Sequence, residues 1–333
     1  MTAGYLEAAR EIAGELAAEL AEDVVRAEAV LNEALGSDSA TVDTIGKHVS
    51  EAGGKRLRPL FVAISARATG LPYDPERVAA LGACMEMIHM ATLIHDDVID
   101  NAETRRGRPT ACSLYGNTAG ILSGDVLLAR AMELLAIDGD LEIIRMVSKS
   151  VVELATGEVM EVDSRGVFDL DEVIHLEILR RKTASFIAAC CRAGAMAAGA
   201  SVAVQEALAV YGEAVGMGFQ IADDLLDYRS EVSGKPRAID FREGCATLPL
   251  IYLRGSLSSD EEAYVRSKFG NGVADVDLDR IGELMAERGA FADAEALARD
   301  YADRALGALG GLPTTTAREV LGGLAGLLIL RDA

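Results

Sequence analysis

The chain has 333 residues, a net charge of -21 at neutral pH and a pI near 4.6, and half of its residues are hydrophobic although it has no Trp. A chain of this length can bury a large core, and its acidic balance argues against a nucleic-acid partner, because neutralising phosphates requires clustered Lys and Arg. The amino-terminal segment lacks the basic and apolar regions of a signal peptide, and no apolar stretch is long enough to cross a bilayer, so we expect a cytoplasmic protein without a transmembrane segment.

Helical periodicity dominates the pattern of apolar residues, and the seven prolines are few, so we predict an all-α fold. The first amphipathic helix is predicted over residues 5–35. A Gly-Gly pair then breaks the pattern, and the cations Lys55, Arg56 and Arg58 mark a turn that opens the next helix. The N-terminus of a helix that carries three cations suits an anion.

Further helices follow in chain order, with polar loops between them. A long helix over residues 78–100 ends in acids and precedes an arginine-rich loop over residues 101–109. The remaining helices before the motif-poor carboxyl-terminal part are predicted over residues 119–135, 141–162, 170–198 and 202–228, and a polar loop over residues 230–244. No linker or shift in composition interrupts the chain, so residues 1–333 are predicted to form one domain. The five cysteines form no CxxC pair and indicate neither disulfides nor zinc.

An acidic pattern, DDxxD, occurs twice in this helical sequence. The first copy contains Asp96, Asp97 and Asp100, and the second contains Asp223, Asp224 and Asp227. Residues i and i+4 of a helix share one face, so the outer carboxylates of each copy can grip one hard cation. Magnesium is the natural occupant, because it takes one or two carboxylates together with phosphate oxygens. A single copy can be a solvated surface face, but two copies with matching apolar flanks favour metal binding.

Several cationic residues lie at positions where they could bind a metal-bound phosphate. Arg105 and Arg106 directly follow the first acidic motif, and their guanidinium groups can fork onto phosphate oxygens. Lys55, Arg58, Lys182 and Lys235 supply further charges near predicted helix ends. His89 is interpreted as a phosphate contact, with a buried core histidine as the alternative.

Six motifs in chain order resemble the trans-isoprenyl (polyprenyl) diphosphate synthase family: GGKRLRP, EMIHMATLIHDDVIDNAETRRGRPT, GDVLLARA, RRKTA, GFQIADDLLD and EGCATLPLI. The resemblance covers about residues 50 to 255. It implies an isoprenoid synthase type I fold, a single-domain bundle of long antiparallel helices around a central cavity, usually assembled as a homodimer. It also implies head-to-tail condensation of isopentenyl diphosphate with an allylic diphosphate to give a trans-polyprenyl diphosphate.

The resemblance also assigns roles to particular residues. It implies that three Mg²⁺ ions bridge the allylic diphosphate and are held by Asp96, Asp97, Asp100, Asp223 and Asp227. The residues that it implies for assisting the allylic diphosphate are Arg105, Lys182, Thr183, Gln220 and Lys235, while Phe219 and Gln220 face the carbocation. Those that it implies for isopentenyl diphosphate are Lys55, Arg58, His89 and Arg106. The whole assignment requires the two acidic motifs to converge across one cavity.

Two departures from the family pattern affect these expectations. Cys245 stands where the family commonly has a lysine, and Glu161 where it often has Gln, so one phosphate contact is expected to be missing. The positions four and five before the first motif, Thr92 and Ala91, are not bulky, which predicts a product longer than farnesyl diphosphate.

Two alternative functions remain open at this point. A terpene cyclase shares the helical fold and one acidic motif, but generally lacks the second DDxxD and the GGKRxRP-type segment. A regulatory or non-catalytic subunit of a heteromeric synthase is supported only by Cys245. The allylic primer, the product length and the pathway served do not follow from the sequence.

Overall fold

The computed structural model describes residues 14–36, 39–51, 56–105, 107–229 and 237–329, and nearly all of its regular structure is helical. The chain divides into two compact units. The first contains Met1–Ser148, Ala189–Ala209 and Gly311–Leu321, and the second contains Lys149–Ala188, Val210–Gly310 and Gly322–Ala333. The expectation of one domain over residues 1–333 stays a prediction.

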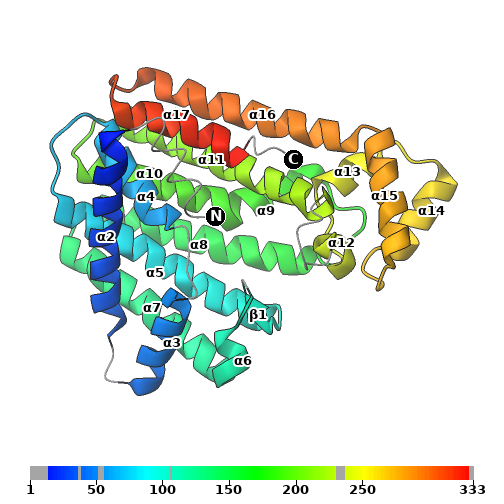
Figure 1. Cartoon of the computed structure of the whole chain (residues 1–333), viewed down its shortest axis with the longest axis horizontal. Coiled ribbons are helices and arrows are strands. Elements are labelled where there is room, and N and C mark those ends of the chain that lie inside the picture. Colours follow the sequence, from blue (N-terminus) through cyan, green and yellow to red (C-terminus); the bar gives the residue numbers. More distant parts are fainter. Residues whose placement is uncertain (1–13, 37–38, 52–55, 106, 230–236, 330–333) are drawn as a thin grey trace. The chain divides into compact units, whose positions relative to one another are not determined.

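The first unit is organised around one long apolar helix. Its helices are α2 (Glu15–Leu35), α3 (Ala40–Glu51), α4 (Leu57–Ala68), α5 (Pro75–Ile99), α6 (Ala111–Tyr115) and α7 (Asn117–Asp138). Figure 1 shows α5 and α7 side by side, with α2 crossing α5. Helix α5 begins sharply, because the Asp74 carboxylate accepts a hydrogen bond from Glu76 N at 3.0 Å and Pro75 is the first helical residue.

Helix α5 is also the one helix in the described part of the chain whose length and hydropathy would suit a membrane span. However, 72% of its most apolar window is buried inside the protein. A helix that is apolar on all sides and covered by neighbours is a core helix. It delivers the first acidic motif from the core of the first unit.

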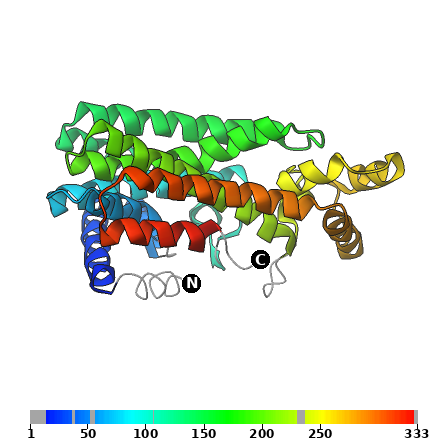
Figure 2. The same ribbon diagram turned by 90° about the horizontal axis from the view of Figure 1, so that it is seen from above.

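The second unit has its own aromatic and aliphatic core. Its elements include α9 (Glu172–Leu179), α12 (Ile239–Glu243), α13 (Leu248–Arg254), α14 (Ser259–Lys268), α15 (Asp275–Glu287) and α16 (Ala290–Ala308). The ring of Phe269 packs edge-on against Phe168 and Phe241, with both pairs of centroids 5.4 Å apart. Figure 2 shows α14 and α15 gathered at one end of α16.

Four unit boundaries fall inside helices, and the fifth falls inside the short turn η2 (Leu309–Gly311). The four helices are α8 (Leu141–Ser164), α10 (Ser185–Ala197), α11 (Val202–Arg229) and α17 (Thr316–Ile329). The predicted helices over 141–162 and 202–228 therefore match the structure to within two residues. The helix predicted over 170–198 is interrupted, because residues Arg180–Ala184 form a π-helical turn between α9 and α10. The sequence RRKTA contains no breaker that would announce this turn.

The arginine-rich segment predicted as a loop contains a small hairpin. Strands β1 (Thr104–Arg105) and β2 (Arg108–Pro109) pair antiparallel, and Gly107 between them has φ of +75°. That backbone conformation favours glycine, which explains the Gly in this tight connection. Strands of two residues are too short to produce a recognisable alternation of apolar and polar residues, so only a loop was predictable.

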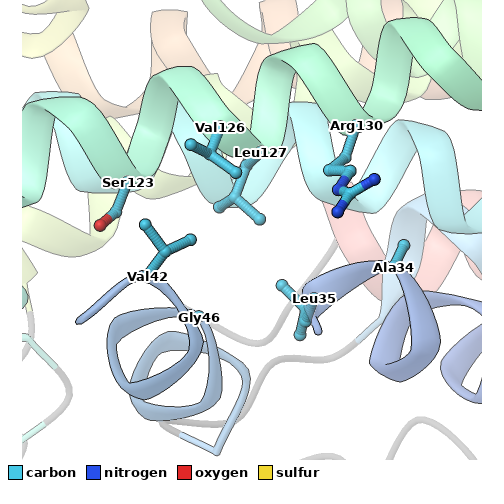
Figure 3. A pocket seen from close by; sticks show the side chains of 8 residues that line it. All are labelled: Ala34, Leu35, Val42, Gly46, Ser123, Val126, Leu127 and Arg130. Carbon is cyan, nitrogen blue, oxygen red and sulfur yellow. The ribbon is translucent and has the colours of Figure 1, made fainter. Parts of the chain in front are cut away.

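A small cavity lies in the first unit between the end of α2, α3 and α7. Figure 3 shows the side chains that face one another there, including Leu35, Val42 and Leu127. Its volume is about 10 Å³, which is room for about one water molecule. This cavity is therefore too small to hold an isoprenoid chain.

Candidate active site

The first acidic motif lies at the carboxyl end of α5. Asp96 is half-buried, Asp97 is 6% exposed and Asp100, the residue that caps the helix, is exposed. The Asp100 N–H donates to Asp96 O at 2.8 Å, so the chain stays helical through the motif. Residues 96 and 100 therefore present their carboxylates on one face, as the spacing predicts.

The middle aspartate of this motif already has a strong partner. Arg105 Nε donates to Asp97 Oδ1 at 2.6 Å across the start of the hairpin. This charge-assisted bond satisfies one oxygen of a buried carboxylate and fixes the Arg105 side chain beside the motif. The neighbouring Arg106 lies outside the described residues.

A close contact between α5 and α7 supports the same turn. His95 Nε2 lies 3.2 Å from Ile121 O and 3.5 Å from Asp125 Oδ1. A Cβ built on Gly124 would lie 2.3 Å from His95 Nε2, so only glycine leaves room for the imidazole. The motif GDVLLARA thus contributes packing beside Asp96 and Asp97.

The described part of the segment GGKRLRP, from Arg56 onward, leads into α4. Arg56 has φ of +46° and donates to Glu28 at 3.0 Å, to Glu86 at 3.1 Å and to Ser50 O at 3.1 Å. Burial lowers the pKa of Arg56, but its bonds to Glu28 and Glu86 outweigh this and raise the pKa above its ordinary value. Arg56 therefore ties the start of α4 to α2, α3 and α5.

The predicted isopentenyl diphosphate contacts are only partly within the described residues. Arg58 lies in the first turn of α4 and His89 in α5, both half-buried and both in the first unit. Glu86, which Arg56 holds, precedes His89 by one helical turn. Lys55 lies outside the described residues.

The second acidic motif lies near the end of α11, in the second unit. Asp223 and Asp227 are half-buried and Asp224 is 6% exposed. The Asp224 carboxylate receives a hydrogen bond from His175, with 2.9 Å between Nε2 and Oδ2. The middle aspartate is thus buried and held by a basic side chain in both motifs.

Asp227 also organises the chain that follows it. Its carboxylate accepts the backbone N–H groups of Ile239 and Asp240, both at 3.1 Å, at the start of α12. Burial, together with the negative charge of Asp224, raises the pKa of Asp227, although these two hydrogen bonds oppose the shift. Burial and the charges of Asp227, Asp224 and Glu161 raise the pKa of Asp240 well above its ordinary range.

The π-helical turn carries the predicted residues Lys182 and Thr183. Lys182 Nζ lies 2.6 Å from Glu161 and 2.9 Å from Glu158 of α8. Burial lowers the pKa of Lys182, but these two carboxylates outweigh it and raise the pKa above its ordinary value. A Cβ on Gly157 would lie 2.8 Å from Lys182 N, so glycine allows α8 to approach the turn closely.

Phe219 and Gln220 lie on α11 one turn before the acidic motif, and both are half-buried. Gly216, which shares their helix face, approaches the π-helical turn so closely that a Cβ there would lie 2.5 Å from Ala184 Cα. The second unit thus brings the neighbourhoods of Gln220 and Thr183 together. Lys235 lies outside the described residues.

Cys245 is half-buried beside the same acidic groups. Its N–H donates to Asp240 O at 2.7 Å. Burial, with the charges of Asp240 and Glu161, raises the pKa of its thiol to about 12, so the side chain is neutral near pH 7. The position that carries a lysine in the family pattern supplies no charge here.

Sequence reasoning missed several residues of this neighbourhood. Glu158, His175 and Asp240 carry no motif of their own, and their partners are distant in the chain. The one signal in the sequence for His175 is its place among the apolar residues Val173, Ile174 and Leu176 of α9. In the described residues no three His, Cys, Asp or Glu side chains are arranged as a ready metal cage.

Comparison with known proteins identifies the family. The model of the family described as Polyprenyl synthetase matches residues 39–282. This chain belongs to that family. A heptaprenyl diphosphate synthase component 2 from Geobacillus stearothermophilus is 37% identical over 315 residues, which cover 94% of this chain and 97% of the relative.

Two solved structures of family members are similar to this chain along nearly its whole length. A decaprenyl diphosphate synthase from Rhodobacter capsulatus is 35% identical, with a TM-score of 0.90 and coverage of 96% of this chain and 99% of the other. A polyprenyl synthase from Caulobacter crescentus complexed with calcium and isoprenyl diphosphate is 36% identical, with a TM-score of 0.88 and 98% of both chains covered. The predicted family, the all-helical isoprenoid synthase fold and the prenyltransferase class are confirmed.

Proposed function

We propose that this polyprenyl synthetase condenses isopentenyl diphosphate head-to-tail with an allylic diphosphate, in a Mg²⁺-dependent reaction, to give a trans-polyprenyl diphosphate longer than farnesyl. The observation that carries this proposal is the duplicated DDxxD motif. In both copies the middle aspartate is buried against a base, while the outer aspartates on the shared helix face are more exposed.

The chemistry of the donor set fits a divalent cation. Asp224, Asp227 and Asp240 gather carboxylates near one helix end, and the mutual repulsion of such groups is relieved by a cation. Mg²⁺ takes only a few carboxylates and completes its shell with water and phosphate, so a preformed cage is not required. We assign the ligands to the carboxylates of both motifs named by the family resemblance: Asp96, Asp97, Asp100, Asp223 and Asp227.

The metal ions, three per site by the family resemblance, would neutralise the charge that develops on the departing diphosphate. Convergence of the two motifs on one diphosphate stays a prediction. The calcium bound in the Caulobacter relative supports a divalent-cation site in the family.

The chain's own residues have separate tasks in this proposal. Arg105, held by Asp97, and Lys182, held between Glu158 and Glu161, orient the allylic diphosphate together with Lys235. Thr183, Phe219 and Gln220 line the place where positive charge appears on the allylic carbon, so that their dipoles and ring face stabilise it. Arg58 and His89, with Lys55 and Arg106, are assigned to isopentenyl diphosphate.

The product length follows from the turn of α5 that precedes the first motif. Ala91 is buried and small, and the Thr92 hydroxyl donates to His89 O at 2.8 Å instead of extending from the helix. Neither residue forms a bulky stop for a growing chain. The hepta- and decaprenyl activities in the names of the relatives support a long product.

We also propose a homodimer in the cytoplasm. Val152, Val159 and Val162 form an exposed apolar stripe at helical spacing on α8, with exposed fractions of 65%, 59% and 42%. A second copy of the chain would bury such a stripe. Because the Geobacillus relative is described as a component 2, assembly with a different subunit is the competing outcome.

The decisive experiment incubates the purified chain alone with labelled isopentenyl diphosphate, MgCl₂ and, in turn, allylic primers of two to four isoprene units. We expect elongation that EDTA abolishes and added Mg²⁺ restores, and chromatography of the products should show chains beyond farnesyl. Products that stop at farnesyl contradict the length assignment. Inactivity of the chain alone, restored by a second subunit, identifies a heteromeric synthase, and release of cyclic hydrocarbon identifies a terpene cyclase.

A further inference from the structure

His175 and Asp224 form a buried polar pair inside the second unit. The side chains of His175 and Asp224 are 7% and 8% exposed, and 49 residues separate the two in the chain. Because a carboxylate only accepts hydrogen bonds, the imidazole nitrogen at 2.9 Å donates. Without that donor the buried Asp224 carboxylate would lose the one side-chain hydrogen bond that it has among the described residues, which is costly.

The His175–Asp224 hydrogen bond influences the direction in which Asp223 and Asp227 point. Consecutive residues on a helix point about 100° apart, whereas residues i and i+4 point within about 40° of each other. The bond to Asp224 therefore helps to orient the end of α11, where Asp223 and Asp227 share another side. Loss of the bond is expected to loosen the orientation of both outer carboxylates together.

The same bond aligns the acidic motif with Lys182. His175 lies on α9, and α9 continues directly into the π-helical turn that carries Lys182. The far end of this turn meets α11 where Gly216 packs against Ala184. The His175–Asp224 bond and this close approach fix α9 against α11 at two points, with Lys182 between them.

The first motif has a matching arrangement, which indicates that the pairing does more than give a buried carboxylate a hydrogen-bond partner. There Asp97, also buried, is held by Arg105. The two motifs bury the same middle position against different partners, an arginine in one and a histidine in the other. Family resemblance gave no role to His175, and the DDxxD pattern alone does not name it.

We propose that His175 is a positioning residue for the acidic motif DDLLD, which holds Asp224 so that Asp223 and Asp227 present a divalent cation to the diphosphate. This inference rests on the proposed function, because it assigns a role within the same site. His175 itself contacts neither metal nor substrate.

The test compares His175→Phe, which keeps a ring but removes the donor, with His175→Gln, which keeps a side-chain N–H. For His175→Phe we expect the Mg²⁺ concentration for half-maximal activity to rise about 10- to 100-fold, the range seen when a group that orients a metal ligand is lost. The KM for isopentenyl diphosphate should change less than about twofold. In His175→Gln, the Mg²⁺ concentration for half-maximal activity should return most of the way to the wild-type value.

The matched control is Tyr252→Phe. Tyr252 OH donates to Glu172 at 2.8 Å, so this change also removes one hydrogen bond from α9 but leaves the acidic motif untouched. Its Mg²⁺ requirement should equal that of the wild type, even where its melting temperature falls. Equal Mg²⁺ requirements in His175→Phe and wild type, with a lower melting temperature alone, would overturn the proposal and leave a purely structural pair.

A second measurement keeps the outcome independent of turnover. Thermal stabilisation by MgCl₂ with inorganic diphosphate is measured for the wild type, His175→Phe, His175→Gln and Asp224→Asn. We expect the stabilisation to shrink in His175→Phe and to return in His175→Gln. If the wild type binds Mg²⁺ and diphosphate but makes no prenyl product, the proposed function fails while the role of His175 is still tested. Should His175→Phe not fold, His175→Leu replaces it in both assays: a higher Mg²⁺ requirement and weaker stabilisation by Mg²⁺ in a folded variant support the role, and wild-type values for both overturn it.

Discussion

The two acidic motifs share one pattern and one burial scheme but obtain their support in different ways. Asp97 is held by Arg105, only eight residues further along the chain, whereas Asp224 is held by His175 at a separation of 49 residues. The first motif ends its helix at an exposed Asp100, while Asp227 of the second caps the start of α12. A DDxxD pattern therefore fixes the faces of the carboxylates, and the surrounding fold decides how firmly they are held.

The largest expected effect comes from removing one outer carboxylate from each motif. Asp96→Asn and Asp223→Asn should each lower kcat/KM for the allylic diphosphate by about 10²- to 10³-fold, because each removes negative charge that holds the metal at the leaving group. If both motifs serve one diphosphate, the double variant should lose less than the product of the single losses. Steady-state kinetics at saturating Mg²⁺ measures all three.

The control for that cycle is Asp300→Asn, which changes an exposed acid on α16 and should leave kcat/KM unchanged. Strict additivity of Asp96→Asn and Asp223→Asn would mean that the two motifs act independently. That outcome would indicate two separate sites, whereas the family resemblance implies that both motifs belong to one site.

The next effect probes the local support of the first motif. Arg105→Met leaves Asp97 buried without its charged donor, so the free energy of unfolding should fall by about 1–3 kcal/mol, and activity should fall as well. Urea denaturation followed by circular dichroism gives the stability. Arg145→Met, which removes an exposed pair with Glu142, should cost well under 1 kcal/mol. Equal losses in the two variants would show that Asp97 does not depend on Arg105.

A smaller effect is expected where the second motif concentrates negative charge. The pKa of Asp240 is raised by burial and by neighbouring carboxylates, so the fold favours its protonated form, and that contribution to stability is lost as pH rises through the raised pKa. Asp240→Asn should therefore raise the melting temperature of the metal-free protein at pH 7–8 by about 2–4 °C, or about 1 kcal/mol for a large domain.

The gain from Asp240→Asn should shrink as the pH is lowered, and calorimetry from pH 5 to 8 in EDTA measures it. In the wild type, MgCl₂ with diphosphate should restore stability, because cations relieve the same repulsion. A lower melting temperature for Asp240→Asn at pH 8 would show that this carboxylate is stabilised by partners and not strained by charge.

The comparison of the motifs also shows which features of the site can be predicted from the sequence. Arg105 stood beside its motif in TRRG, and helical spacing placed Asp96 with Asp100 and Asp223 with Asp227, so these were predictable from local geometry. The pairing of His175 with Asp224, and of Lys182 with Glu158, depends on how distant helices meet, which periodicity does not encode. The π-helical turn was missed for a related reason, since RRKTA has good helix formers and its extra residue reflects close packing against Gly157 and Gly216.

The smallest expected effect tests the departure from the family pattern at Cys245, where the family commonly has a lysine. Cys245 is a neutral thiol beside Asp240 and Glu161, so Cys245→Lys would add an ammonium group to the more acidic of the two motifs. We expect the KM for the allylic diphosphate to fall by about 2- to 10-fold, the scale of one partly exposed charge interaction, with the KM for isopentenyl diphosphate unchanged. Cys245→Met, which has similar bulk but no charge, separates electrostatics from packing. If Met lowers the KM as much as Lys, the cause is shape. If neither variant changes the KM, the charges of Lys182, Glu158 and Glu161 already determine the electrostatics at this end of the site. Cys245 then does not weaken binding of the allylic diphosphate.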